Sequence, residues 1–407
     1  MDCGLLGRTL GHSYSPQIHQ KLGDYTYFLF EVEPEQLERF LKGGSFSGLN
    51  VTIPYKKAVI PYLDDLSPIA RRLGAVNTIV RREDGSLMGH NTDYFGFQTM
   101  VRSSGICPAG KKALVLGSGG ASSMAVAALS DLGAKVVVIS RKGEDNYENL
   151  EKHKNASLIV NATPVGMYPN VGISHVNLDL FPRLEGVLDL VYNPARTQIL
   201  LDAEERGLKV QNGLLMLVAQ AWESAQWFTG KALPEEKIPM IHRQLRNQME
   251  NLILIGMPGC GKSTVGALLA EKLGRKLVDA DQILTEKYGP IPKIFETEGE
   301  EGFRQKETEI LRELGKQSSL LISTGGGCVT RKENYPLLHQ NGRIFEIQRD
   351  LASLSSEGRP LSQRDGVAAL YEKRKPLYEA FRDQAVSNDG TALQCAEEIL
   401  TLWEGSI

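Results

Sequence analysis

Several features that would place a protein in a special class are missing from this chain of 407 residues. Its five cysteines are widely spaced and include no CxxC pair, which argues against a disulfide framework or a zinc site and favours reduced thiols. No apolar run is long enough to cross a bilayer, and the first residues lack the basic start and continuous apolar stretch of a signal peptide. We therefore expect a cytoplasmic protein without a membrane partner.

A strong excess of charge of either sign is also missing. Lys and Arg number 46 and Asp and Glu number 49, which gives a formal net charge of -3. Binding to nucleic acid or to an anionic membrane depends on many cationic contacts, so we expect neither as a partner. Small-molecule substrates are the expected partners. A monomer is compatible with this composition, which does not determine the oligomeric state.

The composition that is present is typical of a globular protein, with 42% apolar and 23% charged residues. The length exceeds the roughly 250 to 300 residues that one hydrophobic core supports, so two or three domains are expected. Short apolar runs that end in glycine alternate with helical patterns, which indicates the α/β class with parallel sheets. Two of these runs lead directly into glycine-rich turns, at residues 111–122 and 251–264.

The pattern divides the chain into three parts. Residues 1–106 have their own strands and helices, and residues 107–211 begin with the strand that precedes the first glycine-rich turn. Residues 212–249 are expected to close back onto the first part, ending in a helix over 235–249. A strand then begins near Leu252 without a flexible linker, so we place a boundary near Glu250 and a separate domain at 250–407. The first two parts should form two lobes with a cleft.

The first glycine-rich turn has the context of a dinucleotide-binding fingerprint, because a strand precedes it and a helix follows it. Glycines allow the backbone to approach a pyrophosphate, whose charge the helix N-terminus stabilises. Ser122 stands where a third glycine is usual, so a plain strand–helix turn is the alternative. The residues expected to bind the cofactor here are Gly117, Ser118, Gly119, Gly120 and Ala121.

The next apolar strand ends in Ser140, Arg141 and Lys142. An enzyme specific for NAD would carry an acidic residue there for the ribose hydroxyl, and that carboxylate would repel a 2'-phosphate. Two cations instead offer charge-assisted hydrogen bonds to the phosphate, which favours NADP(H). A solvated basic turn is the alternative interpretation.

The second glycine-rich turn, GMPGCGKST, matches the phosphate loop GxxxxGK[ST]. Backbone N–H groups of such a loop surround the phosphates of ATP, its lysine neutralises the terminal phosphates, and its hydroxyl ligates Mg²⁺. The motif does not identify the group that accepts the phosphate. The residues expected to bind ATP here are Gly259, Cys260, Gly261, Lys262, Ser263 and Thr264.

Four segments in the first half resemble the shikimate dehydrogenase family: GRTLGHSYSPQIHQ near the start, GLNVTIPYKK at 48–57, GAVNTI at 74–79 and GHNTDYFG at 89–96. Further segments agree in order, among them NATPVGM at 161–167, DLVYNP at 189–194 and NGLLMLVAQA at 212–221. The resemblance extends over about 1–248. It implies a substrate lobe followed by a Rossmann-type NADP-binding lobe. Tyr94 and Lys142 depart from the family pattern.

This resemblance, and not composition or spacing, assigns roles in the first half. It implies that Lys56 and Asp93 are the catalytic pair, with the lysine ammonium stabilising and protonating the oxygen of a ketone that receives hydride. The implied substrate ligands are Ser13, Ser15, Thr52, Lys56, Asn77, Asp93, Tyr192 and Gln220. Leu190 and Gly213 are further implied contacts of the cofactor.

Five segments in the second half resemble the shikimate kinase family, which implies a P-loop domain like that of nucleoside monophosphate kinases: DADQ, IFETEGEEGFRQKE, STGGG, GRPL and KRKPLYE. By this resemblance Asp281 binds the acceptor hydroxyl as the base, Lys262 is catalytic, and Ser263 and Asp279 serve the metal. Arg304 and Arg374 would hold the substrate carboxylate with Gly326 and Gly327, and Arg359 would reach ATP from a short lid. Any one of these arginines could instead lie on a solvated helix face.

Together the two resemblances imply one bifunctional enzyme of chorismate and aromatic amino-acid biosynthesis. The first half would reduce 3-dehydroshikimate to shikimate with NADPH, and the second would transfer phosphate from ATP with Mg²⁺ to the hydroxyl that the first step creates. Two alternatives stay open. The first half could be an NAD-dependent quinate or shikimate oxidoreductase, or one half could be a module that binds its ligand without catalysis.

Overall fold

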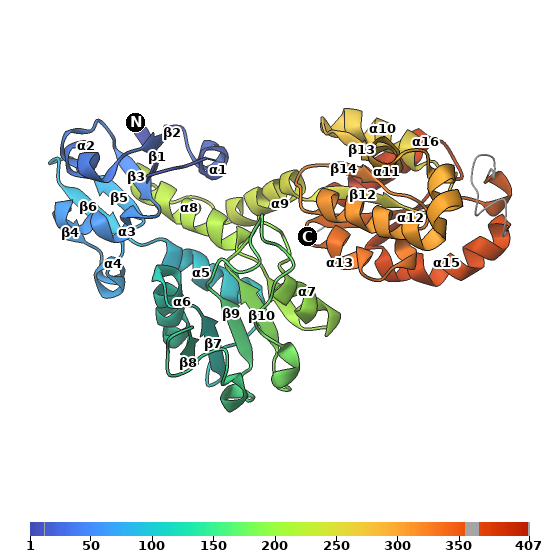
Figure 1. Cartoon of the computed structure of the whole chain (residues 1–407). Coiled ribbons are helices and arrows are strands. Elements are labelled where there is room, and N and C mark those ends of the chain that lie inside the picture. The colour runs from blue at the N-terminus through green and yellow to red at the C-terminus, as the bar shows by residue number, and fades with distance from the viewer. Residues whose placement is uncertain (12, 355–365, 406–407) are drawn as a thin grey trace. The chain divides into compact units, whose positions relative to one another are not determined.

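The computed structural model describes residues 1–11, 13–354 and 366–405, which form two compact units. Unit 1 comprises Met1–Gly166, Gly172–Tyr192 and Asp202–Gln244. Unit 2 comprises Met167–Val171, Asn193–Leu201 and the described part of Leu245–Ile407. Helices and mainly parallel sheets alternate along the chain (Figure 1), so the predicted α/β class is confirmed.

Unit 1 begins with a six-stranded mixed sheet in the order β2-β1-β3-β5-β6-β4. Strands β3 and β5 pair antiparallel, as do β5 and β6, and the other pairs are parallel. The strands are β1 (Asp2–Gly7), β2 (Thr26–Glu31), β3 (Gly48–Val51), β4 (Asp65–Leu66), β5 (Thr78–Arg81) and β6 (Leu87–His90). Helices α1 (Ser15–Leu22), α2 (Leu37–Gly43), α3 (Tyr55–Ala58) and α4 (Pro68–Leu73) connect them.

A second sheet in unit 1 is wholly parallel, in the order β11-β10-β9-β7-β8. The strands are β7 (Lys112–Leu116), β8 (Lys135–Ile139), β9 (Leu158–Asn161), β10 (Gly186–Asp189) and β11 (Lys209–Gln211), and α6 (Gly120–Asp131) follows β7. Strand β9 is buried at every position, as a parallel strand covered on both faces requires. The chain order reverses between β7 and β9. In open α/β sheets, ligands bind beyond the carboxyl ends of strands at such a point.

Two helices connect the parts of unit 1. Helix α5 (Asp93–Ser103) contributes Phe97, Met100 and Val101 to the core of the second sheet and packs along α8 (Leu214–Thr229). Helix α8 also contacts α1 and strands β3 and β5, so it closes back onto the first sheet, and α9 (Lys237–Met249) follows it (Figure 1). The helix predicted over 235–249 is confirmed.

Unit 2 contains a five-stranded parallel sheet in the order β13-β14-β12-β15-β16. Its strands are β12 (Asn251–Ile255), β13 (Leu277–Asp279), β14 (Leu321–Ser323), β15 (Gly342–Gln348) and β16 (Gln384–Ser387). The helices are α10 (Lys262–Leu273), α11 (Ala280–Tyr288), α12 (Ile291–Gly315, kinked at Gly299), α13 (Asn334–His339), α15 (Val367–Phe381) and α16 (Ala392–Gly405). Strand β12 is central and fully buried, and its carboxyl end leads into the phosphate loop.

The remaining elements are short. Helix α7 (Gln198–Glu205) follows β10, and 3-10 helices occur at η1 (Pro34–Gln36), η2 (Ile60–Tyr62), η3 (Leu150–His153), η4 (Leu178–Leu180), η5 (Cys328–Thr330) and η6 (Leu351–Ser353). All five cysteines lie in the described ranges as free thiols, as predicted. In the same ranges no helix is both long and apolar enough to span a membrane.

The contact between α5 and α8 leaves no room for a side chain at Gly96. A Cβ atom there would lie 2.6 Å from the carbonyl oxygen of Met216 and 3.1 Å from Cβ of Gln220. We predict that Gly96→Ala lowers the free energy of unfolding by about 1–3 kcal/mol, the usual cost of overpacking. Chemical denaturation of the variant beside the parent protein measures this difference.

Gly43→Ala is the matched control, because Gly43 also lies in a helix but has open space where its Cβ would be. That change should leave stability unaltered or raise it by up to about 1 kcal/mol, since alanine favours a helix more than glycine does. Equal stability of the two variants would contradict the close packing of α5 against α8.

Candidate active sites

Lys56 and Asp93 form an ion pair in unit 1. Lys56 lies in α3 and donates from Nζ to Asp93 Oδ2 at 2.6 Å. Asp93 is the first residue of α5, where the helix dipole stabilises a carboxylate. The two side chains are 34% and 17% exposed, so the ammonium is accessible while the carboxylate is more enclosed. An ammonium held in this way can present its other N–H bonds to an oxygen of a substrate.

Backbone bonds fix the predicted substrate ligands beside this pair. The carbonyl of Lys56 accepts from Val76 N at 2.7 Å, and Val51 N donates to the Asn77 carbonyl at 2.7 Å, just before Thr52. The side chain of Asn77 is buried and bonded to Thr92, which precedes Asp93, through both Nδ2 and Oδ1. The structure therefore brings Thr52, Lys56, Asn77 and Asp93 together. Much of the bonding capacity of Asn77 is already used within the chain.

The other predicted substrate ligands of unit 1 come from three segments. Ser13 accepts from Ser15 N at 3.2 Å, and Ser15 is the buried first residue of α1. The ring of Tyr192 meets that of Tyr14 edge to face, with centroids 6.4 Å apart. Burial, and then Tyr14, raise the pKa of Tyr192, so its phenol keeps its proton. Gln220 lies on α8, and its Nε2 donates to the Leu217 carbonyl at 2.9 Å.

The predicted dinucleotide turn lies between β7 and α6. Gly117 has a φ of 108°, and a Cβ there would lie 2.9 Å from Thr163 after the neighbouring strand β9, so glycine is required. Ser122 donates to the Gly117 carbonyl at 2.7 Å and closes the turn in place of a third glycine. Ser118, Gly119, Gly120 and Ala121 are exposed at the N-terminus of α6, where backbone N–H groups can face a phosphate.

Two further pairs of predicted cofactor contacts lie near this turn. Gly117 N donates to the carbonyl of Ile139, the residue before Ser140, so Arg141 and Lys142 follow the strand next to the turn and are exposed. Gly213 packs directly on Leu190, because a Cβ on Gly213 would overlap the Leu190 carbonyl. Leu190 follows β10 and Gly213 lies after β11, so both are at the same carboxyl edge of the parallel sheet as the Gly117 turn. Their roles toward a dinucleotide stay predictions.

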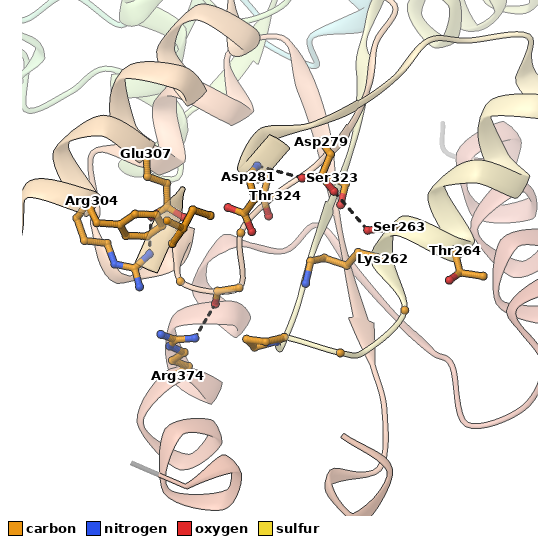
Figure 2. A pocket seen from close by; sticks show the side chains of 18 of the residues that line it. Lys262, Ser263, Thr264, Asp279, Asp281, Arg304, Glu307, Ser323, Thr324 and Arg374 are labelled. Carbon is orange, nitrogen blue, oxygen red and sulfur yellow. Dashed lines mark hydrogen bonds and ion pairs between the residues drawn. The ribbon is translucent and has the colours of Figure 1, made fainter. Parts of the chain in front are cut away.

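Unit 2 contains a pocket of about 480 Å³ at the carboxyl ends of its strands (Figure 2). Lys262 is buried at its base and donates from Nζ to the carbonyls of Gly256 at 2.9 Å and Met257 at 3.1 Å. Gly259, Gly261, Ser263 and Thr264 also line the pocket, whereas the Cys260 side chain is buried beneath the loop. The Cys260 N–H donates to the Met257 carbonyl and its carbonyl accepts from Asn388, so this predicted ATP contact does not line the pocket.

Ser263 and Asp279 supply oxygen ligands of the kind that Mg²⁺ prefers. Ser263 Oγ donates to Asp279 Oδ2 at 3.3 Å, and Asp279 Oδ1 caps α11 by accepting from two backbone N–H groups (Figure 2). Magnesium is commonly held by one or two protein oxygens together with phosphates and waters, so this pair fits the ion. Within the described ranges no cluster of three His, Cys, Asp or Glu residues forms an all-protein metal site.

The environment of Asp281 raises its pKa to about 6, mainly through burial and secondly through the negative charges of Glu307 and Asp279. A Cβ added to Gly325 would lie 2.6 Å from both Asp281 Oδ1 and Glu307 Oε1, so the two carboxylates flank this glycine. A carboxylate with such a pKa can accept a proton from an alcohol more readily than an ordinary aspartate.

Two buried arginines face the same pocket from different helices (Figure 2). Arg304 on α12 donates to Glu307 Oε2 at 2.6 Å, and its Nε has no partner within the described chain. Arg374 on α15 donates to the Gly326 carbonyl at 3.1 Å, and a Cβ on Gly327 would overlap the Arg304 guanidinium. The missing side chain at Gly327 therefore allows the Arg304 guanidinium to approach, while Arg374 is held by the Gly326 carbonyl. Paired donors of this kind suit a small carboxylate.

Sequence reasoning missed several lining residues of this pocket: Ile291, Phe295, Phe303, Glu307, Thr324 and Arg349. The spacing of three residues between Arg304 and Glu307 on a helix was the one available signal, since such pairs face each other. The apolar residues gave no signal, because core positions look the same. Arg359 and the part of the predicted lid up to residue 365 lie outside the described residues.

Comparison with known proteins finds a matching protein family for each half of the chain. A family model described as shikimate dehydrogenase substrate binding domain matches residues 5–79, and one described as shikimate kinase matches residues 258–404. A curated shikimate dehydrogenase (NADP(+)) of Clostridium beijerinckii is 38% identical over 250 residues, covering 55% of this chain and 92% of the relative.

Two solved structures extend the comparison. Shikimate 5-dehydrogenase from Thermus thermophilus, in complex with NADP(H) and shikimate, is 35% identical, covers 60% of this chain and 99% of its own, and has a TM-score of 0.53. Quinate dehydrogenase from Corynebacterium glutamicum, in complex with NAD, is 27% identical, covers 60% and 98%, and has a TM-score of 0.55. The chain thus belongs to the shikimate dehydrogenase family and carries a shikimate kinase domain in its second half.

Proposed function

We propose that this chain reduces 3-dehydroshikimate to shikimate with NADPH and then phosphorylates shikimate to shikimate 3-phosphate with ATP. The observation that carries this proposal is that one polypeptide holds the Lys56–Asp93 pair and, in unit 2, a pocket with two arginines and a raised-pKa aspartate. The product of the first reaction is the acceptor in the second. The reactions would be consecutive steps of chorismate and aromatic amino-acid biosynthesis.

The Lys56 ammonium acts in the first reaction. NADPH bound at the Gly117 turn would supply a hydride to the ring ketone, whose oxygen would then gain negative charge. Lys56 Nζ stabilises that oxygen and gives it a proton, while Asp93 keeps the ammonium in place and can accept from a neighbouring ring hydroxyl. Thr52, Asn77 and the serines before α1 would bind the carboxylate and hydroxyls that orient the ring.

In the second reaction the residues of the unit 2 pocket act on the hydroxyl produced by the first. Arg304 and Arg374 bind the ring carboxylate, which turns the hydroxyl toward the phosphate loop, and Asp281 accepts its proton. Lys262 stabilises the charge on the phosphoryl group in transfer. Mg²⁺ bound at Ser263 and Asp279 would neutralise phosphate charge. Such a phosphoryl transfer depends on the positioning of both substrates and on positive charge, and it needs no covalent intermediate with the enzyme.

An NAD-dependent quinate oxidoreductase is the competing function for unit 1, since a quinate dehydrogenase shares its fold. Arg141 and Lys142 disfavour that reading, because a cationic turn serves a 2'-phosphate that NAD lacks. A module that binds ligands without catalysis is disfavoured by the pairing of Lys56 with Asp93 and of Ser263 with Asp279.

The test supplies purified protein with dehydroshikimate, NADPH, ATP and Mg²⁺ and follows NADPH oxidation and ADP formation separately. Lys56→Ala should lower NADPH oxidation by about 100-fold or more, the upper range for loss of a general acid. ADP formation from added shikimate should be unchanged in that variant. Exposed Lys57→Ala is the control and should behave as the parent does. Normal NADPH oxidation by Lys56→Ala would refute the assignment.

Kinase activity should depend on the ionisation of Asp281. Because its pKa is about 6, kcat/KM for shikimate should fall as the pH falls through 6, where the carboxylate takes up a proton and no longer acts as a base. Glu307→Gln removes a charge that raises this pKa, so the acidic limb of the pH–rate profile should move to lower pH. A limb that stays in place or moves to higher pH would contradict the coupling of the two carboxylates.

Arg304→Ala should raise the shikimate concentration needed for half-maximal kinase rate by about 10- to 100-fold, because a charge-assisted contact is lost. The corresponding ATP concentration should change little. Arg312→Ala, on an exposed position of the same helix, controls for general effects on α12. Steady-state kinetics with each substrate varied in turn measure both constants, and an equal rise in both would oppose the assignment of Arg304 to the carboxylate.

A further inference from the structure

The two cations at the end of β8 are presented by a tight turn. Gly143 N donates to the Ser140 carbonyl at 3.3 Å, which makes Arg141 and Lys142 the central residues of a β-turn, and both are exposed. A Cβ on Gly143 would lie 2.7 Å from Ser140 Oγ and 3.0 Å from the Asp145 carbonyl, so a larger residue would have to shift both neighbours. The position of the two cations therefore depends on the residues that hold this turn.

The carboxylate of Asp145 follows the turn closely enough in sequence to reduce the positive charge that Arg141 and Lys142 present. Ser140 N donates to the Asp145 carbonyl at 3.1 Å, so Asp145 is drawn back to the start of the turn. A carboxylate beside a 2'-phosphate would repel it, which is how acidic residues in this region favour NAD. An unrestrained Asp145 could also pair with Arg141 or Lys142 and reduce their attraction for phosphate.

His153 forms a hydrogen bond with the carboxylate of Asp145. Its ring lies 2.8 Å from the Asp145 carboxylate, measured from Nε2 to Oδ1, and is almost fully buried at the end of η3. A carboxylate can only accept, so Nε2 of His153 must carry the proton of this hydrogen bond. The Asp145 carboxylate, 34% exposed, is thereby bonded to the ring of His153, and among the described residues it forms no ion pair with Arg141 or Lys142.

A packing role alone does not account for His153. Its Nδ1 is buried and has no partner among the described residues, and an unsatisfied buried polar atom costs about 1–3 kcal/mol. An apolar side chain would avoid this cost. The backbone of the segment has other supports, since Asn146 donates to the Gly143 carbonyl and Asn149 to the Glu144 carbonyl. What His153 adds is a bond to the carboxylate itself.

We propose that His153 is a positioning residue for cofactor selection, which holds the Asp145 carboxylate away from Arg141 and Lys142 and so leaves both cations for a 2'-phosphate. This inference rests on the proposed use of NADP(H) by unit 1. The group recognised is the 2'-phosphate of the adenine ribose. No residue of the pair touches the reacting atoms.

The experiment measures kcat/KM with NADPH and with NADH for dehydroshikimate reduction by the whole chain. His153→Leu should lower the ratio of the two values about tenfold, because the released carboxylate weakens charge-assisted contacts to the phosphate. His153→Gln should keep the parent ratio, since its amide N–H can still donate to Asp145. Asp145→Asn added to His153→Leu should restore the ratio, because the amide carries no charge.

Kinase activity and NADH-linked reduction of the same samples show that each variant is folded. The inference would be overturned if His153→Leu lowered kcat/KM equally with NADPH and with NADH. It would also be overturned if the double variant did not recover the parent ratio of the two values, and His153 would then have a purely structural role. A parent protein without preference for NADPH would overturn the proposed cofactor as well. The two failures are therefore distinguishable.

Discussion

Parallel strands gather side chains from distant parts of a sequence at one edge of a sheet, and both nucleotide sites of this protein depend on that constraint. In unit 1 the carboxyl ends of β7 and β8 bring the Gly117 turn next to the turn of Arg141 and Lys142. In unit 2 the ends of β12, β13 and β14 bring Lys262, Asp279 and Thr324 into one pocket. Glycine follows β7 and β12 directly and follows β14 after Thr324. A side chain at these positions would collide with Thr163 at Gly117, with the Ile347 carbonyl at Gly256, and with the Asp281 and Glu307 carboxylates at Gly325.

Much of this architecture could be predicted from the sequence. The strand–turn–helix context of both glycine-rich turns and the helix that ends at Met249 follow from local patterns, because they depend on neighbouring residues alone. The proximity of Lys56 and Asp93 does not follow in this way, since 37 positions separate them. Their segments are joined by bonds from Val76 to Lys56 and between Asn77 and Thr92, which no local pattern shows. For that pair, resemblance to a family supplied what periodicity could not.

Other features were beyond prediction because they depend on the shape of the interior. The role of Glu307 arises from burial next to Arg304 and from the missing side chain at Gly325, which lets a second carboxylate approach. The pairing of Asp145 with His153 is similar, because an irregular segment and not a helix follows β8. In both cases the decisive quantity is the electrostatic surroundings of a carboxylate.

Helix α9 ends at Met249 and β12 begins at Asn251, so one residue separates the last helix of the dehydrogenase region from the first strand of the kinase domain. Ribosomes must therefore make the two sites in equal numbers. Gene expression can change the total amount of this protein but not the molar ratio of its two sites. If shikimate passes from one site to the other as proposed, the balance between its formation and its consumption is set by the kinetic constants of the two sites rather than by their amounts.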